Sequence, residues 1–207
     1  HRLHHTVRLG NRLFAGCWHG GVRIVDVNDI RKPTTIGAYN YHPPMPEPSH
    51  TFMGLTRKIN GRDIAVAIDE EDHVHSDAEV AKRRGRPHAA LWTFDITEPA
   101  NIKPLGVFEV SELESPWART APGRFGGHQF QEHWKGGDTL VYCAWFAGGL
   151  RIVDVADPAA PQEVGWYIPE PCGGKPCPQT NDVDVDERGV IYAADRYCGL
   201  DLLEFKR

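Results

Sequence analysis

The 207-residue sequence lacks the features of several large classes of protein. No apolar run is long enough to span a bilayer, so we expect no membrane segment. Lys and Arg number 23 against 28 Asp and Glu, a net charge of −5. This mild acidity argues against nucleic acid as a partner, because nucleic-acid binding needs a concentrated basic surface.

Common catalytic motifs are also missing. There is no P-loop, no glycine-rich dinucleotide fingerprint, no Gly-x-Ser-x-Gly elbow and no HExxH. The few serines lie in polar or proline-rich loops, which argues against a serine triad. The chain opens at His1 without methionine, which predicts a processed or excised product. The compartment stays open, with a soluble cytoplasmic protein favoured over a periplasmic or secreted one.

The five cysteines are an odd number. Cys17 and Cys143 fall inside apolar, strand-like runs, where we expect buried free thiols. Cys172 and Cys177 flank the sequence GGKP in a loop that fits either a small disulfide or a metal pair. No second pair with this spacing exists, which argues against a metal there.

The clearest pattern that is present is a repeat. GGVRIVDV occupies residues 20–27 and GGLRIVDV occupies residues 148–155. Comparable runs ending in an acid recur at Asp26, Asp95, Asp154 and Glu204. An apolar run precedes each acid, and after the first three come a proline-containing turn and a short apolar strand with an internal glycine. We interpret the acids as turn-forming residues, because Asp side chains commonly bond to the backbone of turns.

Each unit therefore consists of short runs rich in Val, Ile, Tyr, Trp and Phe, separated by turn residues. No segment has sustained helical periodicity. Four-stranded antiparallel units at this period predict an all-β fold, a β-propeller in which each unit is one blade. The expected blades are residues 1–48, 49–126, 127–179 and an incomplete 180–207.

The last unit lacks its outer strand, which predicts that the four blades belong to a larger ring of six to eight. An upstream segment or a second chain is expected to complete the ring, since an open edge strand invites aggregation. Residues 69–88 form an insertion between the second and third strands of the second blade. This rim insertion is either a lid or contact arm, or a flexible charged loop.

The repeated GGVRIVDV and GGLRIVDV segments resemble the LVIVD-repeat family of β-propellers. The longer pattern NRLFAGCWHGGVRIVDVNDI is similar, more distantly, to a blade of the selenium-binding protein and methanethiol oxidase family. The first resemblance implies the propeller fold and leaves the function open. The second favours an oxidoreductase over a hydrolase.

Aligning the four units at their innermost strands places His5, His50, His128 and Asn181 at one position. Innermost strands line the central channel of a propeller, so these residues are expected to meet at one mouth. Three imidazoles resemble the ligand set of a catalytic metal site for Fe, Mn, Cu, Zn or Ni. The alternative is that each histidine only bonds to the backbone of a neighbouring blade.

Three further residues are candidates for catalysis. Glu132 and His133 follow His128 closely and fit either a general acid and base or residues that orient the ligands. His88 lies where the insertion returns to a strand and is expected to face the channel. Within the insertion, His73 and His75 alternate as on one face of a strand.

These observations predict a metal-dependent propeller enzyme that acts on a small organic molecule, with the metal held by His5, His50 and His128. An oxidoreductase is favoured, and a hydrolase or lyase at the same site is the alternative. The rival from another class is a non-catalytic binding or scaffold propeller whose histidines are structural.

Overall fold

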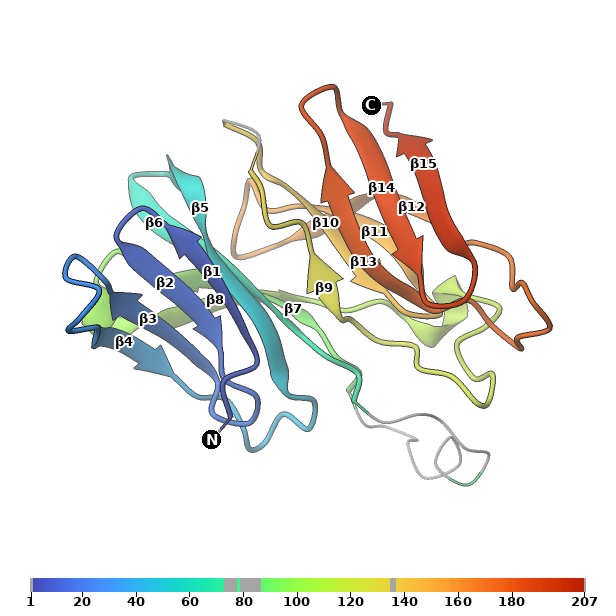
Figure 1. Ribbon diagram of the computed structural model, residues 1–207, viewed down its shortest axis with the longest axis horizontal. Helices are drawn as coiled ribbons and strands as arrows, with labels where there is room; N and C mark the ends of the chain where they lie inside the picture. Colours follow the sequence, from blue (N-terminus) through green and yellow to red (C-terminus); the bar gives the residue numbers. More distant parts are fainter. Residues whose placement is uncertain (1, 73–77, 79–86, 135–136, 207) are drawn as a thin grey trace.

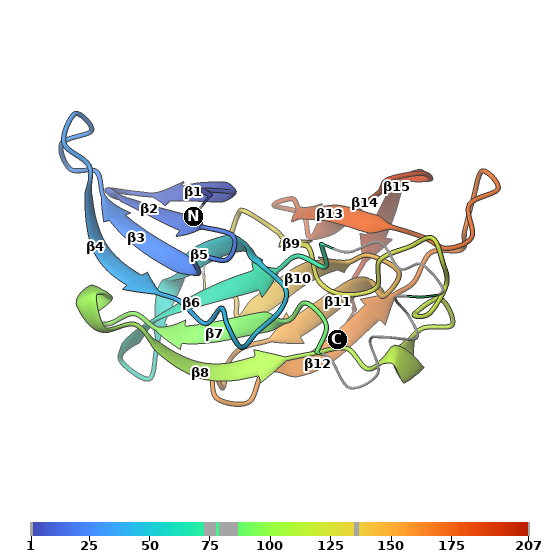
Figure 2. The same cartoon turned by 90° about the horizontal axis from the view of Figure 1, so that it is seen from below.

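A computed structural model describes residues 2–72, 78, 87–134 and 137–206 of the chain. Its strands form four antiparallel sheets, each built from consecutive strands of the sequence. The four sheets follow one another along an arc, with the first and last at opposite ends (Figure 1 and Figure 2). The predicted all-β fold is confirmed: three four-stranded sheets and one three-stranded sheet are arranged as the blades of a four-bladed β-propeller.

Blade 1 contains β1 (His5–Leu9), β2 (Arg12–Gly16), β3 (Val22–Asp26) and β4 (Thr34–Tyr39). Blade 2 contains β5 (Ser49–Ile59), β6 (Arg62–Asp69), β7 (Leu91–Asp95) and β8 (Lys103–Phe108). Blade 3 contains β9 (Gln129–Phe130), β10 (Leu140–Trp145), β11 (Gly149–Asp154) and β12 (Gln162–Tyr167). Blade 4 contains β13 (Thr180–Val185), β14 (Val190–Asp195) and β15 (Gly199–Glu204). Two short 3-10 turns, η1 (Pro99–Asn101) and η2 (Glu112–Glu114), lie in the connections.

The hydrophobic core lies between the blades, because each sheet buries a face against its neighbour. Between blades 1 and 2, Phe14 and Ile24 pack against Phe52 and Phe94. The corresponding layer between blades 2 and 3 includes Met53, Val66, Ile68, Val141 and Trp145. The layer between blades 3 and 4 includes Leu140, Ile152, Val183, Ile191 and Leu203. Strands β10 and β11 have neighbours on both faces and are almost entirely buried, whereas β12 alternates between half-buried and exposed residues.

The glycine inside each outer strand sets how closely the next blade approaches. A Cβ on Gly37 would lie 2.2 Å from the carbonyl oxygen of Pro99, in the η1 turn of blade 2. A Cβ on Gly106 would lie 2.6 Å from the carbonyl oxygen of Pro158 in blade 3. Both distances are far below contact distance, so only glycine permits this approach. The repeated glycine therefore marks the place where one blade receives the turn of the next.

The repeated acids close the turns after the third strands, as predicted. Asp26 accepts a hydrogen bond from the backbone N–H of Asn28, Asp95 from Thr97 and Asp154 from Ala156, at 2.8–2.9 Å. Each bond spans two residues, the geometry of an Asx turn. These carboxylates hold the proline-containing turns that dock onto the neighbouring blade.

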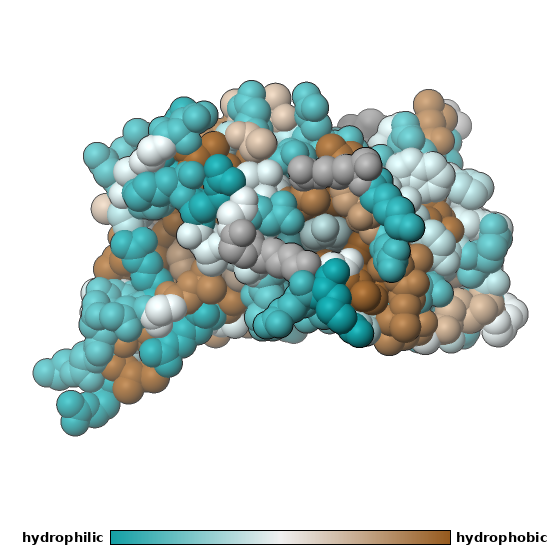
Figure 3. Space-filling view, turned by 90° about the horizontal axis from the view of Figure 1, so that it is seen from above, coloured by the Kyte–Doolittle hydropathy of each residue, from teal (hydrophilic) through white to brown (hydrophobic). Residues whose placement is uncertain are grey.

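Blade 4 ends at β15, which pairs with β14 and has no partner on its other edge among the described residues. Leu200 and Leu202 on this strand are 56% and 63% exposed, and Trp166 on β12 is 62% exposed. Figure 3 shows separate hydrophobic patches on both halves of this face, among them one on the right-hand half, which Figure 1 gives to blades 3 and 4. Completion of the ring by an upstream segment or a second chain stays a prediction.

Among the described residues, no helix combines the length and apolar character that crossing a membrane requires.

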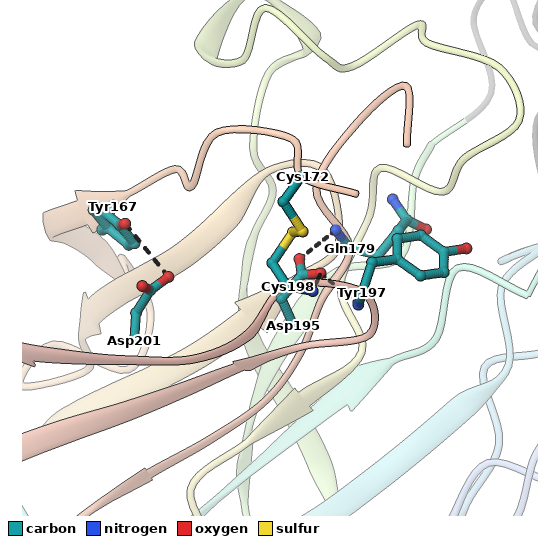
Figure 4. Close-up of a disulfide and its surroundings, with 7 residues drawn as sticks. All are labelled: Tyr167, Cys172, Gln179, Asp195, Tyr197, Cys198 and Asp201. Carbon is teal, nitrogen blue, oxygen red and sulfur yellow. Dashed lines mark hydrogen bonds between the residues drawn. A yellow bond between two sulfur atoms is a disulfide. The ribbon is translucent and has the colours of Figure 1, made fainter. Parts of the chain in front are cut away.

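The disulfide of the protein joins Cys172 to Cys198, so the small Cys172–Cys177 disulfide that the sequence allowed does not form (Figure 4). A turn closed by a hydrogen bond from Lys175 N to Cys172 O directs Cys172 towards the hairpin between β14 and β15. Asp195 holds Cys198 there by accepting from its backbone N–H at 3.1 Å. Cys177 is instead a buried free thiol, as Cys17 and Cys143 are.

The 69–88 insertion lies between β6 and β7, and most of it falls outside the described residues. His73 and His75 belong to that part. The two ends of the insertion are described and are taken up below.

We predict that Gly37→Ala destabilises the protein by about 1–3 kcal/mol, the usual cost of overpacking a tight contact. The new methyl group would collide with the backbone of η1 and force blades 1 and 2 apart. Chemical denaturation of Gly37→Ala against Thr35→Ala, an exposed site on the same strand, measures this cost. Equal stability of the two variants would show that the contact does not set the blade spacing.

We predict that Cys198→Ser lowers the free energy of unfolding by about 3 kcal/mol, because the disulfide closes a chain segment with a sequence separation of 26. A reducing agent should lower the denaturation midpoint of the unmodified protein and of Cys177→Ser, but not that of Cys198→Ser. If Cys177→Ser abolishes the effect of the reducing agent and Cys198→Ser does not, the pairing described above is incorrect.

Candidate metal centre

The candidate site lies where the innermost strands begin. In an antiparallel hairpin, the start of the first strand is beside the end of the second. His4 N donates to Gly16 O at the end of β2, and His128 N donates to Ala144 O near the end of β10. His4 and His128 therefore occupy equivalent places in blades 1 and 3, and the blade packing brings them to one side of the molecule.

A buried carboxylate lies at the centre of the histidines. The Nε2 atom of His4 is 3.8 Å from Glu70 Oε2, and that of His50 is 3.9 Å from the same oxygen. The Nε2 atom of His128 is 3.7 Å from Glu70 Oε1, which also accepts a 2.7 Å hydrogen bond from Arg124 Nη1. Three imidazoles from blades 1, 2 and 3 thus face one carboxylate.

The tautomer of His50 follows from its hydrogen-bond chain. The Gln129 amide is oriented by two bonds: its Oε1 accepts from Phe130 N, and its Nε2 donates to Glu132 Oε1. Thr51 Oγ1 donates its single proton to that Gln129 oxygen. Thr51 must then accept from His50 Nδ1–H, 2.7 Å away. The Nε2 atom of neutral His50 therefore presents a lone pair towards Glu70.

His128 has the same orientation for a simpler reason. Its Nδ1 atom bonds to the carbonyl oxygen of Asn181 in β13, and a carbonyl can only accept. The proton of neutral His128 is therefore on Nδ1, and Nε2 carries a lone pair. A backbone carbonyl at the second nitrogen is a common way to orient a metal-binding histidine.

His4 is held by ring contacts. Its ring stacks on Trp18 with the centroids 4.7 Å apart and lies 4.3 Å from the ring of His50. Its Nδ1 atom is buried and has no hydrogen-bond partner among the described residues. Among the described residues neither nitrogen donates to or accepts from another group, and Nε2 faces Glu70.

Burial makes the imidazoles neutral and acts against the charge of the carboxylate. It lowers the pKa of His50 to about 2 and that of His128 to about 4, and the positive charge of Arg196 acts in the same direction. Burial also lowers the pKa of His4, with Arg2 adding to the effect. The pKa of Glu70 is raised by burial, which outweighs the opposing influence of Arg124.

A second polar network holds the backbone that carries Glu70. The preceding residue, Asp69, is buried and accepts hydrogen bonds from Tyr41 Oη and Trp92 Nε1, each 2.7 Å long. The backbone N–H of Glu70 itself donates to Pro48 O. Glu70 therefore projects from a segment fixed on both sides.

Of the predicted metal ligands, His50 and His128 lie in this cluster and His5 lies beside it. The ring of His5 stacks 5.6 Å from that of His50, but its Nε2 bonds to Glu132 at 2.7 Å. His4 belongs to the group of potential ligand atoms that lie within 4.8 Å of one another, together with His50 and Glu70. The role of His5 as a ligand stays a prediction.

The predicted catalytic residues take different positions. Glu132 reaches His50 through the Gln129–Thr51 chain described above, so it is linked to the cluster without facing Glu70. His133 is largely exposed, lies 3.6 Å from Asp184, and lines a cavity of about 270 Å³ on blade 4.

His88, at the end of the insertion, contacts Glu71 near its beginning. Its Nδ1 lies 3.2 Å from the Glu71 carboxylate and its Nε2 lies 3.1 Å from Glu112. Its ring also lies 5.0 Å from the ring of Phe125. A catalytic role for His88 or His133 stays a prediction.

The sequence analysis missed His4, Glu70, Arg124 and Arg196. Glu70 and Arg196 could have been found from their position in the repeat. Each directly follows the second strand of its blade, Glu70 after β6 and Arg196 after β14, as Phe146 follows β10. Because these positions lie beside the inner-strand starts, they belong to the same mouth as the histidines. The polar members of that set, Glu70 and Arg196, stand out against the aromatic Phe146.

The donor set fits a transition metal or zinc ion. Metal–nitrogen and metal–oxygen bonds are about 2.1 Å, so two ligand atoms on one ion lie at most about 4.2 Å apart. The Nε2–oxygen separations of 3.7, 3.8 and 3.9 Å around Glu70 meet this limit, and the ligand atoms of His4, His50 and Glu70 all lie within 4.8 Å of one another, so a small shift of the side chains would close the set around an ion. The Nε2 lone pairs of His50 and His128 point at the carboxylate of Glu70. Lone pairs and carboxylate oxygens are all acceptors, so a cation between them would be favourable. Arg124 satisfies one oxygen of Glu70 and leaves the other facing His4 and His50.

The blades and this cluster define the protein as a β-propeller with a candidate metal centre. A family model described as the LVIVD repeat matches residues 139–168, which contain β10, β11 and β12 of blade 3. This supports the predicted resemblance to a propeller family. The more distant resemblance to the selenium-binding protein and methanethiol oxidase family stays a prediction. No curated protein matches the chain.

Among solved structures, the chain is similar to the major allergen Mala s 1 of Malassezia sympodialis, with a TM-score of 0.60 and 14% sequence identity. The match covers 98% of this chain and 60% of that one, so this chain spans less than two thirds of the allergen's length. At this identity the likeness shows the fold alone.

We predict that His50 and His128 are both neutral with the proton on Nδ1 at pH 7, because their pKa values are lowered to about 2 and about 4. Nitrogen-15 NMR of the imidazole rings in the metal-free protein distinguishes the two tautomers. In Thr51→Val, the His50 signals should change while those of His128 stay the same, since only His50 loses its Nδ1 acceptor. A proton on Nε2 of either ring would contradict the proposed orientation.

Proposed function

We propose that this propeller is a metal-dependent enzyme that acts on a small organic molecule at the mouth of its channel. The observation that carries the proposal is the convergence of three imidazole Nε2 atoms on Glu70 within 3.7–3.9 Å. Partners at Nδ1 leave the Nε2 lone pairs of His50 and His128 available as ligands. Histidine with one carboxylate is a common ligand set for catalytic zinc and for iron, manganese and copper.

In this proposal His4, His50 and Glu70 hold the ion, with His128 as a further ligand. The ion would polarise a bound oxygen atom as a Lewis acid or support oxidation chemistry. The protein contributes orientation: Thr51 and the carbonyl of Asn181 fix two rings, and the Asp69 network fixes Glu70. Because these hydrogen bonds already hold the ligand side chains in place, they favour binding of the ion.

The type of reaction is a further part of the proposal. The distant resemblance to the methanethiol oxidase family favours an oxidoreductase. A hydrolase or lyase would use the same ion as a Lewis acid, and Glu132 is then the nearest candidate for moving a proton, through its hydrogen bond to His5.

The second candidate is a non-catalytic binding or scaffold propeller. It is favoured by the 2.7 Å hydrogen bond between Arg124 and Glu70, which satisfies one carboxylate oxygen without a metal. In that case Glu70 and Arg124 tie blade 2 to the segment that leads into blade 3, and the histidines serve as packing residues. The two candidates differ in whether the protein binds a stoichiometric metal.

Elemental analysis tests the proposal directly. After expression with added Fe, Mn, Cu and Zn, we expect close to one metal ion per chain. The double variant His50→Ala and His128→Ala should lose it, because the remaining donors cannot enclose the ion. His133→Ala is the matched control, since His133 is an exposed histidine that contacts Asp184.

Two single variants then separate the ligand sets. His4→Ala should lower the metal content strongly and His5→Ala weakly, because His4 and not His5 faces Glu70. Circular dichroism of each variant shows whether the blades are intact. A well-folded protein without metal under all four supplements would refute the enzyme proposal and leave the scaffold.

A further inference from the structure

Three arginines surround the histidine cluster, each with its guanidinium against an aromatic ring. The Cζ atom of Arg2 lies 5.4 Å from the ring centroid of Trp18. The Cζ atoms of Arg124 and Arg196 lie 5.1 and 5.4 Å from the centroid of Phe146. Such stacking holds a guanidinium in place while its edge remains available for hydrogen bonds.

The same aromatic rings contact the histidines, so the arginines belong to the candidate metal centre. Trp18 stacks on His4, and the ring of Phe146 lies 4.9 Å from that of His128. The charge of Arg196 lowers the pKa of both His50 and His128, as expected for a cation beside the two rings.

Arg2 and Arg196 are cations without a carboxylate partner in the described part of the chain. Arg124 forms its ion pair with Glu70. Within the described part of the chain, no carboxylate lies within 4.0 Å of the guanidinium of Arg2 or Arg196, and both residues are exposed. Arg196 donates through Nε to Asn181 Oδ1, which orients the guanidinium and leaves its two terminal nitrogens to bind another group.

The charges around the cluster therefore favour an anion. Glu70 is paired with Arg124 and Glu132 is bonded to His5, whereas the guanidinium groups of Arg2 and Arg196 have no carboxylate within 4.0 Å among the described residues. A bound divalent cation would increase the positive excess further. Arginine forks bind carboxylate and phosphate oxygens in pairs of hydrogen bonds, more strongly than they bind neutral groups.

We infer that the site selects a small organic anion, whose carboxylate or other oxyanion is bound by Arg196. The rest of the molecule would face the metal. This inference rests on the proposed function and names the substrate class of the same site.

Calorimetric titration of the metal-loaded chain tests the inference with benzoate, phenylphosphate and the neutral analogue benzamide. Benzoate should bind at least about tenfold more tightly than benzamide, and Arg196→Gln should remove most of this difference. The affinity for benzamide should not change in Arg196→Gln. Comparison of benzoate with phenylphosphate shows which oxyanion the site prefers.

The control is Arg31→Gln, which removes an arginine that is highly exposed and interacts with Asp29 in the same turn. It should leave every affinity unchanged. Equal binding of benzoate and benzamide, or an Arg196→Gln variant that binds benzoate as well as the unmodified protein, would overturn the inference.

Metal analysis of Arg196→Gln separates the two proposals: normal metal content with lost anion preference supports both. Absence of metal from the unmodified protein counts against the proposed function and not against anion selection, which the same titrations on the metal-free chain then decide.

Discussion

The close approach between consecutive blades is the constraint on which the rest of the structure depends. A glycine in one outer strand admits the backbone of the next blade's turn, and an Asp side chain closes that turn. This contact limits how far two blades can separate at their outer edges. The apolar layers between the sheets then bring the inner strands together, and the polar cluster exists only because these strands converge.

The convergence places polar groups where solvent is scarce, and this determines their chemistry. Burial keeps the imidazoles of His50 and His128 neutral and raises the pKa of Glu70. Buried polar atoms need partners, and here the partners are unevenly distributed: Arg124 donates to one oxygen of Glu70, while the rings of His4 and His50 from blades 1 and 2 face the other. An ion at the centre and an anion on the outer arginines would both complete this arrangement.

Much of the fold could be predicted because its signals are local. Alternating apolar residues, turn-forming acids and internal glycines each act within one hairpin, so a repeat of these features predicts a repeat of the blade. The same regularity located His50 and His128. It missed His4 because the strand register in blade 1 is set by pairing with Gly16, which alternation in one strand cannot show. The sequence left a Cys172–Cys177 disulfide open, and it does not form because the loop turns Cys172 towards a hairpin that lies later in the chain.

The sequence by itself therefore determined the blades, their order and the side on which histidines would gather, since these follow from periodicity and turn chemistry. Only the tertiary structure decided which side chains meet. Glu70, Arg124 and Arg196 come from three separate segments, and their proximity depends on the angle between blades. Likewise, the tautomers of the histidines depend on partners such as Asn181 in the next blade. Packing between blades brings these side chains together, and it leaves no periodic pattern in the sequence from which the site could be predicted.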